Sequence, residues 1–482
     1  MNTISSLIRK IKGFFTKERK AKDYCPSESD KSEYNHIDWT TLLPDPVLKV
    51  VFEYYTFGTL TSQSSVSASP LFVDADPRFG PLCITHVCGR WRHIAISMAH
   101  LWSSIRVSNN HHPDLLKQWI QRSKDQPLSL SLDCVYPPRI DANTNPHVSR
   151  PFEPHQHLYH SRINIALRLI ATEMRRWRRL DITLDFESAS AFMQMSLVNA
   201  SNLMQISIQF TAVNAASMPP QLLQFMDNSL DSLSSLRLLT WDSALPREQM
   251  FLPLRNHDIL DRSSLWKRLD QIQLRTGLTM NEAVAFLSCC VNASFVAIEC
   301  IVNNEMDDGE LESISTVGPK QGTILTLLKL KELSVGFGGA ACDCTRILER
   351  FTFPSLQSLC IYNFETRRSS CYRIEDLVNR SMNIDQDSPI DQQLCRAKPP
   401  STGLHLLLIK DEYMSEEIVF QLIRIPALQC IPILNLYTRK PVKWEVISET
   451  LRSLSVQRDV EHMDLWCGTW IGWGGFPGSS QY

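Results

Sequence analysis

The sequence lacks the short patterns that bind phosphates or place a catalytic nucleophile. Its 482 residues contain no G-x-G-x-x-G or G-K-[ST] loop and no G-x-S-x-G elbow. The 14 cysteines never form the paired C-x2-C blocks of a structural zinc site, and His155, His157 and His160 have no further ligand at a fixed spacing. We therefore expect no catalytic residue, no cofactor and no metal, and hence not an enzyme.

Long hydrophobic runs and an excess of charge are absent as well. No stretch of 18 apolar residues occurs, so no transmembrane helix is expected. The 49 Lys and Arg residues nearly balance the 51 Asp and Glu residues, which leaves no global basic field to hold nucleic acid. The N-terminus does not resemble a secretory signal, so we expect reduced thiols and a cytoplasmic and/or nuclear protein.

Residues 1–36 are expected to form a basic arm and a polar linker. Apolar side chains recur at helical spacing between Lys and Arg residues. This pattern fits an amphipathic helix that contacts an anionic membrane or a nuclear import receptor, and it also fits a solvated, flexible arm. The sequence leaves these alternatives open.

Two helices are expected next, separated by a loop over residues 58–80 that is rich in Ser, Thr and Gly. The first covers 43–57, where Asp45 is positioned to accept hydrogen bonds from free backbone N–H groups and Pro46 to start the helix. The second covers about 81–98 and contains Gly89. Its stretch PLCITHVCGRWRHIAISMAHLWSSI places Cys88 and Trp91 on one apolar face, which favours a structural role over metal or nucleophile chemistry.

These two segments resemble the F-box of fungal F-box proteins. The resemblance rests on LLPDPVLKVVFEYY and on the string VC-x-x-WR-x-I-A followed by LW, and it covers about residues 40–107. The sequence departs from the pattern where Pro46 follows Asp45 and where Gly89 replaces a basic residue.

The resemblance implies a three-helix F-box over 37–107 that docks onto a Skp-family adaptor and, through it, a cullin and a RING subunit. A module of this size buries too little surface to be robust alone, so part of its apolar surface would be covered by the partner. The expected adaptor-binding residues are Leu43, Pro44, Val47, Leu48, Val51 and Phe52. The expected core residues of the F-box are Val87, Cys88, Trp91, Ile94, Ala95, Leu101 and Trp102.

Residues 108–440 repeat a pattern in which a helical stretch precedes apolar-x-x-apolar-x-apolar. Nine matches occur at intervals of 24 to 48 residues: WRRLDI, LMQISI, LSSLRL, LDQIQL, FVAIEC, LKELSV, LQSLCI, LHLLLI and LQCIPI. Thr279 with Glu282 forms a candidate capping box, and Ser415 is a candidate N-cap. The expected fold is α+β: a small all-α module followed by an irregular leucine-rich-repeat-like α/β solenoid. An ordinary α/β domain with helices on both faces is the alternative.

Polar residues between the strand apolars would form an exposed strand face. They are Asp181, Thr183, Gln205, Ser207, Gln271, Gln273, Glu299, Ser334, Ser358 and Lys410. Residues 441–482, with Trp466, Trp470 and Trp473, would form a cap, or alternatively a binding lip. The expected function is substrate recognition in an SCF-type E3 ubiquitin ligase, with an unknown target protein on the repeats. The alternative is a protein-interaction scaffold that acts without a ligase.

Overall fold

A computed structural model describes most of the two predicted regions. The described residues are 43–57, 73–74, 80–107, 113–135, 154–211, 225, 229–243, 264–302, 324–338, 345–363, 374, 376–377, 403–411, 414–425, 428, 431, 433–438 and 465–466. The predicted basic arm, most of the predicted loop 58–80 and nearly all of the predicted tail lie outside them. Contacts divide the chain into two compact units, Met1–Asp133 with Arg168–Ile170 and Cys134–Leu167 with Ala171–Tyr482.

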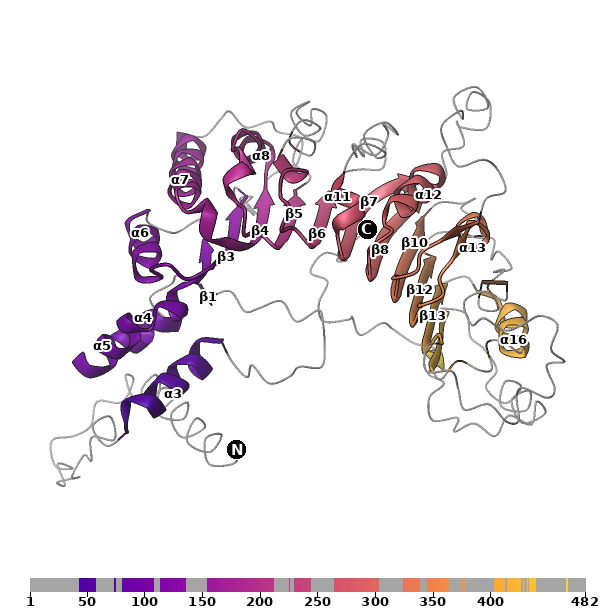
Figure 1. Ribbon diagram of the computed structural model, residues 1–482, viewed down its shortest axis with the longest axis horizontal. Helices are drawn as coiled ribbons and strands as arrows, with labels where there is room; N and C mark the ends of the chain where they lie inside the picture. The colour runs from indigo at the N-terminus through magenta and orange to yellow at the C-terminus, as the bar shows by residue number, and fades with distance from the viewer. Residues whose placement is uncertain are drawn as a thin grey trace, which may run out of the picture. The chain divides into compact units, whose positions relative to one another are not determined.

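Three helices of the first unit pack against one another: α3 (Asp45–Phe57), α4 (Gly80–Thr85) and α5 (Gly89–Ser97) (Figure 1). In α3, the backbone N–H groups of Val47 and Leu48 donate to the carbonyl of Pro44. Asp45 is the first residue of α3, and its carboxylate accepts a hydrogen bond from Arg90 Nε at 3.1 Å. The start of α3 is therefore tied to α5.

The predicted single helix over 81–98 is two helices. The chain turns at His86 and Val87, and Cys88 adopts an extended backbone as the N-cap of α5, with its Sγ accepting from the Trp91 N–H at 3.5 Å. Arg92 Nε donates to the carbonyl of Thr85 at the end of α4, at 2.9 Å. Glycine disfavours a helix interior, so the chain breaks where Gly89 can become the first helical residue.

A short run of strands follows in the same unit. Strands β1 (Val73–Asp74), β2 (Ser104–Val107) and β3 (Leu128–Cys134) pair in parallel, and β1 falls inside the predicted loop 58–80. The 3-10 helix η1 (Ala99–Trp102) leads into β2, and α6 (Pro113–Arg122) leads into β3. Trp102 is fully buried, donates from Nε1 to the carbonyl of Ala95 at 2.9 Å and packs edge-on against Trp119 with ring centres 5.1 Å apart.

The second unit contains ten hydrogen-bonded parallel strands, which are drawn in Figure 1. Each strand pairs with the next in the order β4-β5-β6-β7-β8-β10-β12-β13-β14-β15. Their bounds are Trp177–Leu184, Gln205–Phe210, Leu238–Ser243, Gln271–Thr279, Phe295–Val302, Glu332–Gly338, Ser358–Asn363, Leu406–Asp411, Ile433–Tyr437 and Leu465–Trp466. A separate parallel pair joins β9 (Leu325–Thr326) and β11 (Phe351–Thr352).

Helices and helical turns connect successive strands. They are α7 (Pro154–Ala171), η2 (Met174–Arg176), α8 (Phe186–Met193), η3 (Leu197–Asn199), α11 (Ser264–Arg268), α12 (Met280–Cys289), α13 (Thr345–Arg350) and α16 (Glu416–Arg424). Helices α8, α12 and α13 lie along one side of the sheet (Figure 1). The predicted capping box of Thr279 and Glu282 and the predicted N-cap Ser415 are confirmed. A second capping box, Asp185 with Ser188, was not predicted.

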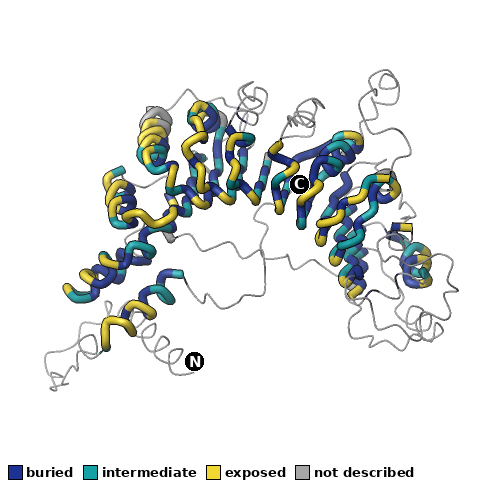
Figure 2. Tube along the Cα trace, viewed as in Figure 1, coloured by how far each residue is buried: buried dark blue, intermediate teal, exposed yellow. Residues whose placement is uncertain are grey.

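In β5, β6, β12, β13 and most of β7, buried residues alternate with half-buried ones, as the two colours along the strands in Figure 2 show. This period of two places one side-chain row in the core beneath the helices and leaves the other row on the opposite face. Parallel strands, each preceded by connecting segments and stacked in sequence order, make a leucine-rich-repeat-like α/β solenoid. The predicted fold class is confirmed.

Three of the nine predicted strand matches are out of frame. The apolar positions of LSSLRL, FVAIEC and LQCIPI are displaced by two or three residues from those that the hydrogen-bond register selects. The buried residues of the observed frames are Leu236, Leu239 and Trp241; Ala293, Val296 and Ile298; and Ile431, Leu434 and Leu436. Apolar residues are dense enough here for several frames to fit one template, and the pairing with neighbouring strands decides among them.

The capping box of α12 gives a stability prediction. The Thr279 side chain accepts from the Glu282 N–H at 3.3 Å, and the Glu282 side chain accepts from the Thr279 N–H at 2.7 Å. Thr279→Ala should destabilise α12 by about 1 kcal/mol, while Thr279→Ser, which keeps the acceptor, should cost far less. Hydrogen exchange of the α12 amides measures both; equal protection in the two variants would contradict the assignment.

Candidate functional site

The start of α3 carries the exposed apolar side chains of the helical unit. Val47 and Val50 are 38% and 49% exposed, Pro44 is exposed and Leu43 is half-buried. Positions three apart lie on one side of a helix, so Val47 and Val50 form a continuous patch that Pro44 extends. We refer to Leu43, Pro44, Val47 and Val50 as the outward face of α3. Val50 was not among the predicted residues, although its spacing from Val47 is visible in the sequence.

Three predicted adaptor-binding residues do not lie on this face. Leu48, Val51 and Phe52 are 0%, 5% and 0% exposed, and the Phe52 ring packs 5.0 Å from the ring of Trp91. The prediction that they belong to the apolar surface left for a partner is therefore corrected: they fill the interior between α3, α4 and α5. A helix with apolar residues on most of its circumference has a buried and an exposed apolar side, and the resemblance did not say which residues lie on each.

The predicted F-box core residues lie mostly in this interior. Trp91, Ile94, Ala95, Leu101 and Trp102 are buried. Val87 and Cys88 are half-buried, because they occupy the turn between α4 and α5. The described cysteines are all free thiols, and no group of three His, Cys, Asp or Glu side chains within the described residues is arranged to hold a metal ion.

Arg90 organises the backbone at the outward face. Its Nη2 donates to the carbonyl of Leu43 at 2.7 Å, and its Nε and Nη2 both reach the Asp45 carboxylate. A guanidinium can make these bonds together because its donors are fixed in one plane. The loop residues Leu43 and Pro44 are thereby held to α5. Sequence reasoning missed Arg90, because no local pattern relates it to a residue 45 positions earlier.

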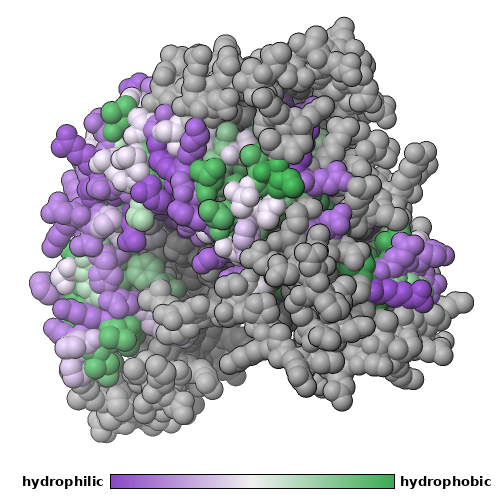
Figure 3. Space-filling model, turned by 45° about the vertical axis from the view of Figure 1, so that its right-hand side comes forward, coloured by the Kyte–Doolittle hydropathy of each residue, from purple (hydrophilic) through white to green (hydrophobic). Residues whose placement is uncertain are grey.

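The second candidate surface is the half-buried row of the sheet, which we call the strand face. All ten residues predicted to point outward between the strand apolars are half-buried and lie on it. On the face of the molecule drawn in Figure 3, the described surface is largely hydrophilic with smaller hydrophobic areas. The ten side chains of the strand face are carboxylates, amides, hydroxyls and one amine, so this face offers a mixture of hydrogen-bonding groups, as a surface for a protein ligand would.

A charged cluster lies on the strand face across β6, β7 and β8. Arg275 Nε donates to Glu299 Oε1 at 2.7 Å, and Arg275 Nη1 lies 3.5 Å from Asp242 Oδ2. Gln273 donates to the same Glu299 oxygen at 3.1 Å. Burial raises the pKa of both Asp242 and Glu299, and Arg275 opposes the rise in each. One cation thus holds two desolvated carboxylates together across three strands.

The strand face becomes more aromatic toward its end. Tyr362 and Tyr437 lie on β12 and β14, and Lys410 between them has its Nζ 5.4 Å from the Tyr437 ring centre. Burial raises the pKa of the Cys360 thiol and of the Tyr362 hydroxyl, so both groups stay protonated at neutral pH. A protonated thiol is a weak nucleophile, so Cys360 and Tyr362 are suited to contacting a ligand by packing and hydrogen bonding.

In the described part of the chain, no helix has both the length and the apolar content needed to cross a bilayer.

The charged cluster predicts a pH dependence. A carboxylate with a raised pKa in the folded state contributes stability that is lost as the pH rises from its unfolded pKa, about 4, through the folded value. Arg275→Gln removes the cation that limits this loss, so its denaturant midpoint should fall more steeply than wild type between about pH 4 and pH 8. Arg275→Lys, which keeps the charge, and Arg162→Gln on the exposed surface of α7 are the controls; identical slopes in all four proteins would refute the role of the cluster.

No protein-family model matches this chain, and neither does any curated protein.

Proposed function

We propose that this chain is the substrate-recognition subunit of an SCF-type cullin-RING E3 ubiquitin ligase. In this proposal α3, α4 and α5 form an F-box that docks on a Skp-family adaptor, and the adaptor connects the chain to a cullin and a RING subunit. The solenoid binds a target protein. The protein acts in the cytoplasm, in the nucleus or in both, and makes no chemical step itself.

The observation that carries the proposal is the outward face of α3. Pro44, Val47 and Val50 expose apolar surface side by side, although the same helix buries Leu48, Val51 and Phe52 completely or nearly so. Single exposed apolar residues are ordinary on protein surfaces, but neighbouring ones on a small helical module favour a partner that covers them. The face also coincides with the Leu43-Pro44 start of the F-box-like segment.

The second unit supports the other half of the proposal. A parallel solenoid exposes one long face to which every repeat contributes a few side chains, and such faces suit protein ligands. A target held there would have its lysines at high effective concentration near the ubiquitin-loaded partner of the ligase. Catalysis by proximity requires no acid, base or nucleophile from this chain.

A protein-interaction scaffold that never joins a ligase is the second candidate. The burial of Leu48, Val51 and Phe52 favours it, because these residues cannot contact an adaptor while the helices remain packed. The apolar surface left for docking is then limited to the outward face of α3. A scaffold would keep the target-binding role of the solenoid and lose the link to ubiquitin transfer.

Co-purification with a Skp-family adaptor and a cullin separates the two candidates. We expect wild-type protein to bring down both, and Val47→Glu with Val50→Glu to lose them, because two carboxylates would enter the apolar contact. Removing such anchors typically costs about 1 kcal/mol or more each in binding.

The matched control introduces two carboxylates at apolar positions elsewhere that are, as a pair, at least as exposed as Val47 and Val50. Ile165 and Val198 are 43% and 61% exposed, and Ile165→Glu with Val198→Glu should retain the adaptor. Folded wild-type protein that brings down no adaptor would reject the ligase proposal and leave the scaffold.

A further inference from the structure

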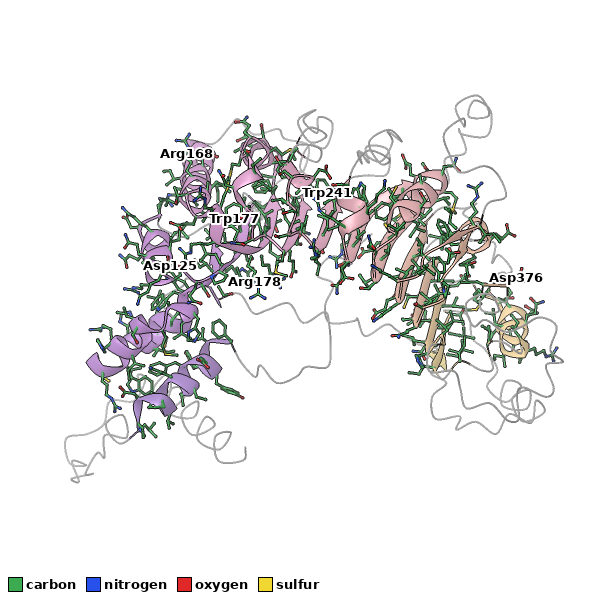
Figure 4. The ribbon with its side chains drawn as sticks, viewed as in Figure 1. Asp125, Arg168, Trp177, Arg178, Trp241 and Asp376 are labelled. Atoms are coloured by element: carbon green, nitrogen blue, oxygen red, sulfur yellow. The ribbon has the colours of Figure 1, made fainter. Side chains whose placement is uncertain are left out.

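A row of residues marks the point at which each repeat enters the sheet. In this row the backbone N–H of one repeat donates to the backbone carbonyl of the repeat before it, at 2.7 to 2.9 Å in every case. The row, which we call the entry row, consists of Arg178, Met204, Arg237, Asp270, Ser294, Lys331, Gln357 and His405. All of these residues are exposed except Ser294, which is half-buried. Figure 4 labels Arg178 at this edge of the sheet.

A second line of hydrogen bonds fixes the turn just before the entry row. Asn202 Nδ2 donates to the Arg175 carbonyl at 2.7 Å, and Asn292 Nδ2 donates to the Lys267 carbonyl. Ser355 Oγ donates in the same way to the Leu328 carbonyl at 2.6 Å. In each of these bonds the donor side chain belongs to the residue two positions before an entry-row residue. The acceptor carbonyl lies in the preceding repeat, three positions before the entry-row residue of that repeat. Because hydrogen bonds join neighbouring repeats along both lines, the side chains on these lines have a fixed spacing.

Positive charge collects along this edge. The cations that the two lines expose and that the argument below uses are Arg175, Arg178, Arg237, Lys329 and Lys331. We call them the basic edge. Asp270 and Glu332 are the exposed anions in the same described segments, while Glu173 and Asp231 already pair with Arg176 and Arg268. The whole chain has a net charge of −2, so this edge is a local departure from the average.

Among the residues that the structure describes, no ion pair joins a cation of the basic edge to a carboxylate. Arg237 donates from Nη1 to the carbonyls of Ser234 and Leu236, and Lys329 donates to the Asn292 side chain, so both contact neutral groups. Burial lowers the pKa of nearby Arg268; the charge of Arg237 lowers it further, and Asp231 opposes the change. The charges of the basic edge therefore remain available to an external anion.

Exposed apolar side chains lie among these cations. Met204, between Arg178 and Arg237 in the entry row, is 44% exposed. Val291 and Leu328, each three residues before the row, are 45% and 66% exposed. A ligand that matched this edge would therefore carry anionic and apolar groups together, spaced along one direction.

We propose that the basic edge binds an acidic segment of a partner protein in which Asp or Glu residues are interspersed with apolar ones. The inference names the chemistry of the target under the proposed function and rests on it. From β4 to β10 the edge spans five strand spacings, about 24 Å, which an extended peptide of about seven residues covers. A protein segment fits better than nucleic acid, because Asp270 and Glu332 would repel an unbroken row of phosphates. No exposed aromatic side chain among the described residues of the edge is available to stack on bases.

Fluorescence anisotropy with the full chain tests the proposal. The probe is a labelled peptide of about twelve residues that alternates Asp or Glu with Leu. We expect it to bind wild type, and Arg178→Glu with Arg237→Glu and Lys331→Glu to weaken binding about tenfold or more. Raising the ionic strength from about 0.1 M to about 0.5 M should weaken the wild-type interaction as well.

The matched control reverses three exposed cations elsewhere, Lys117→Glu with Arg162→Glu and Arg168→Glu, and should bind the peptide like wild type. The neutral set Arg178→Gln, Arg237→Gln and Lys331→Gln replaces the reversal variant if that variant does not fold, with the same expected direction.

Equal binding by the edge and control variants, or no binding by wild type, would overturn the proposal. Tighter binding of a single-stranded DNA of equal length, lost in the edge variant, would overturn it in favour of nucleic acid. Adaptor co-purification from the same preparations is the separate test of the ligase function, because it does not depend on the basic edge.

Discussion

The second unit depends on the continuous backbone hydrogen bonding at the entry row. The N–H of each row residue donates to the carbonyl of the row residue in the repeat before it, and in most repeats the next N–H donates to the same carbonyl. The residue just before the row, such as Trp177, Leu203 or Leu330, is buried. This arrangement sets where every strand begins, so it also sets which side chains reach the strand face. The helices between strands can differ in length because the register is fixed at the entry point and not along the connection. The same constraint therefore sets the spacing of the side chains on the strand face and on the basic edge.

Much of this fold follows from the sequence. The apolar template with its preceding helix indicated a solenoid, and the box of Thr279 with Glu282 and the cap Ser415 gave correct helix starts. The frames around Leu236, Val296 and Leu434 could not be predicted, because side-chain pattern alone does not say which carbonyl each N–H will meet. The ladder that decides this is a property of neighbouring repeats, separated by tens of residues.

The candidate sites show the same limit. Periodicity identified α3 as an apolar helix, and the F-box resemblance then assigned Leu48, Val51 and Phe52 to the adaptor, although they are buried. A helix that is apolar on two sides does not reveal its buried side until its neighbours are placed. Cys88 was predicted to lie inside a single helix, but it is the N-cap of α5, because the helix breaks just before Gly89. Arg90 and the charges of the basic edge come together only through tertiary contacts, so local spacing carried no sign of them.

The irregular spacing of the entry row has a consequence for how such a chain can diverge. Successive row residues lie from 24 residues apart, between Asp270 and Ser294, to 48 apart, between Gln357 and His405. Inserting residues after a strand lengthens only the path to the next repeat, whereas a single insertion at the row itself would displace every partner downstream in that strand. Lineages descending from such a protein should therefore accumulate length changes on the helical side and keep the turn into each strand constant in size.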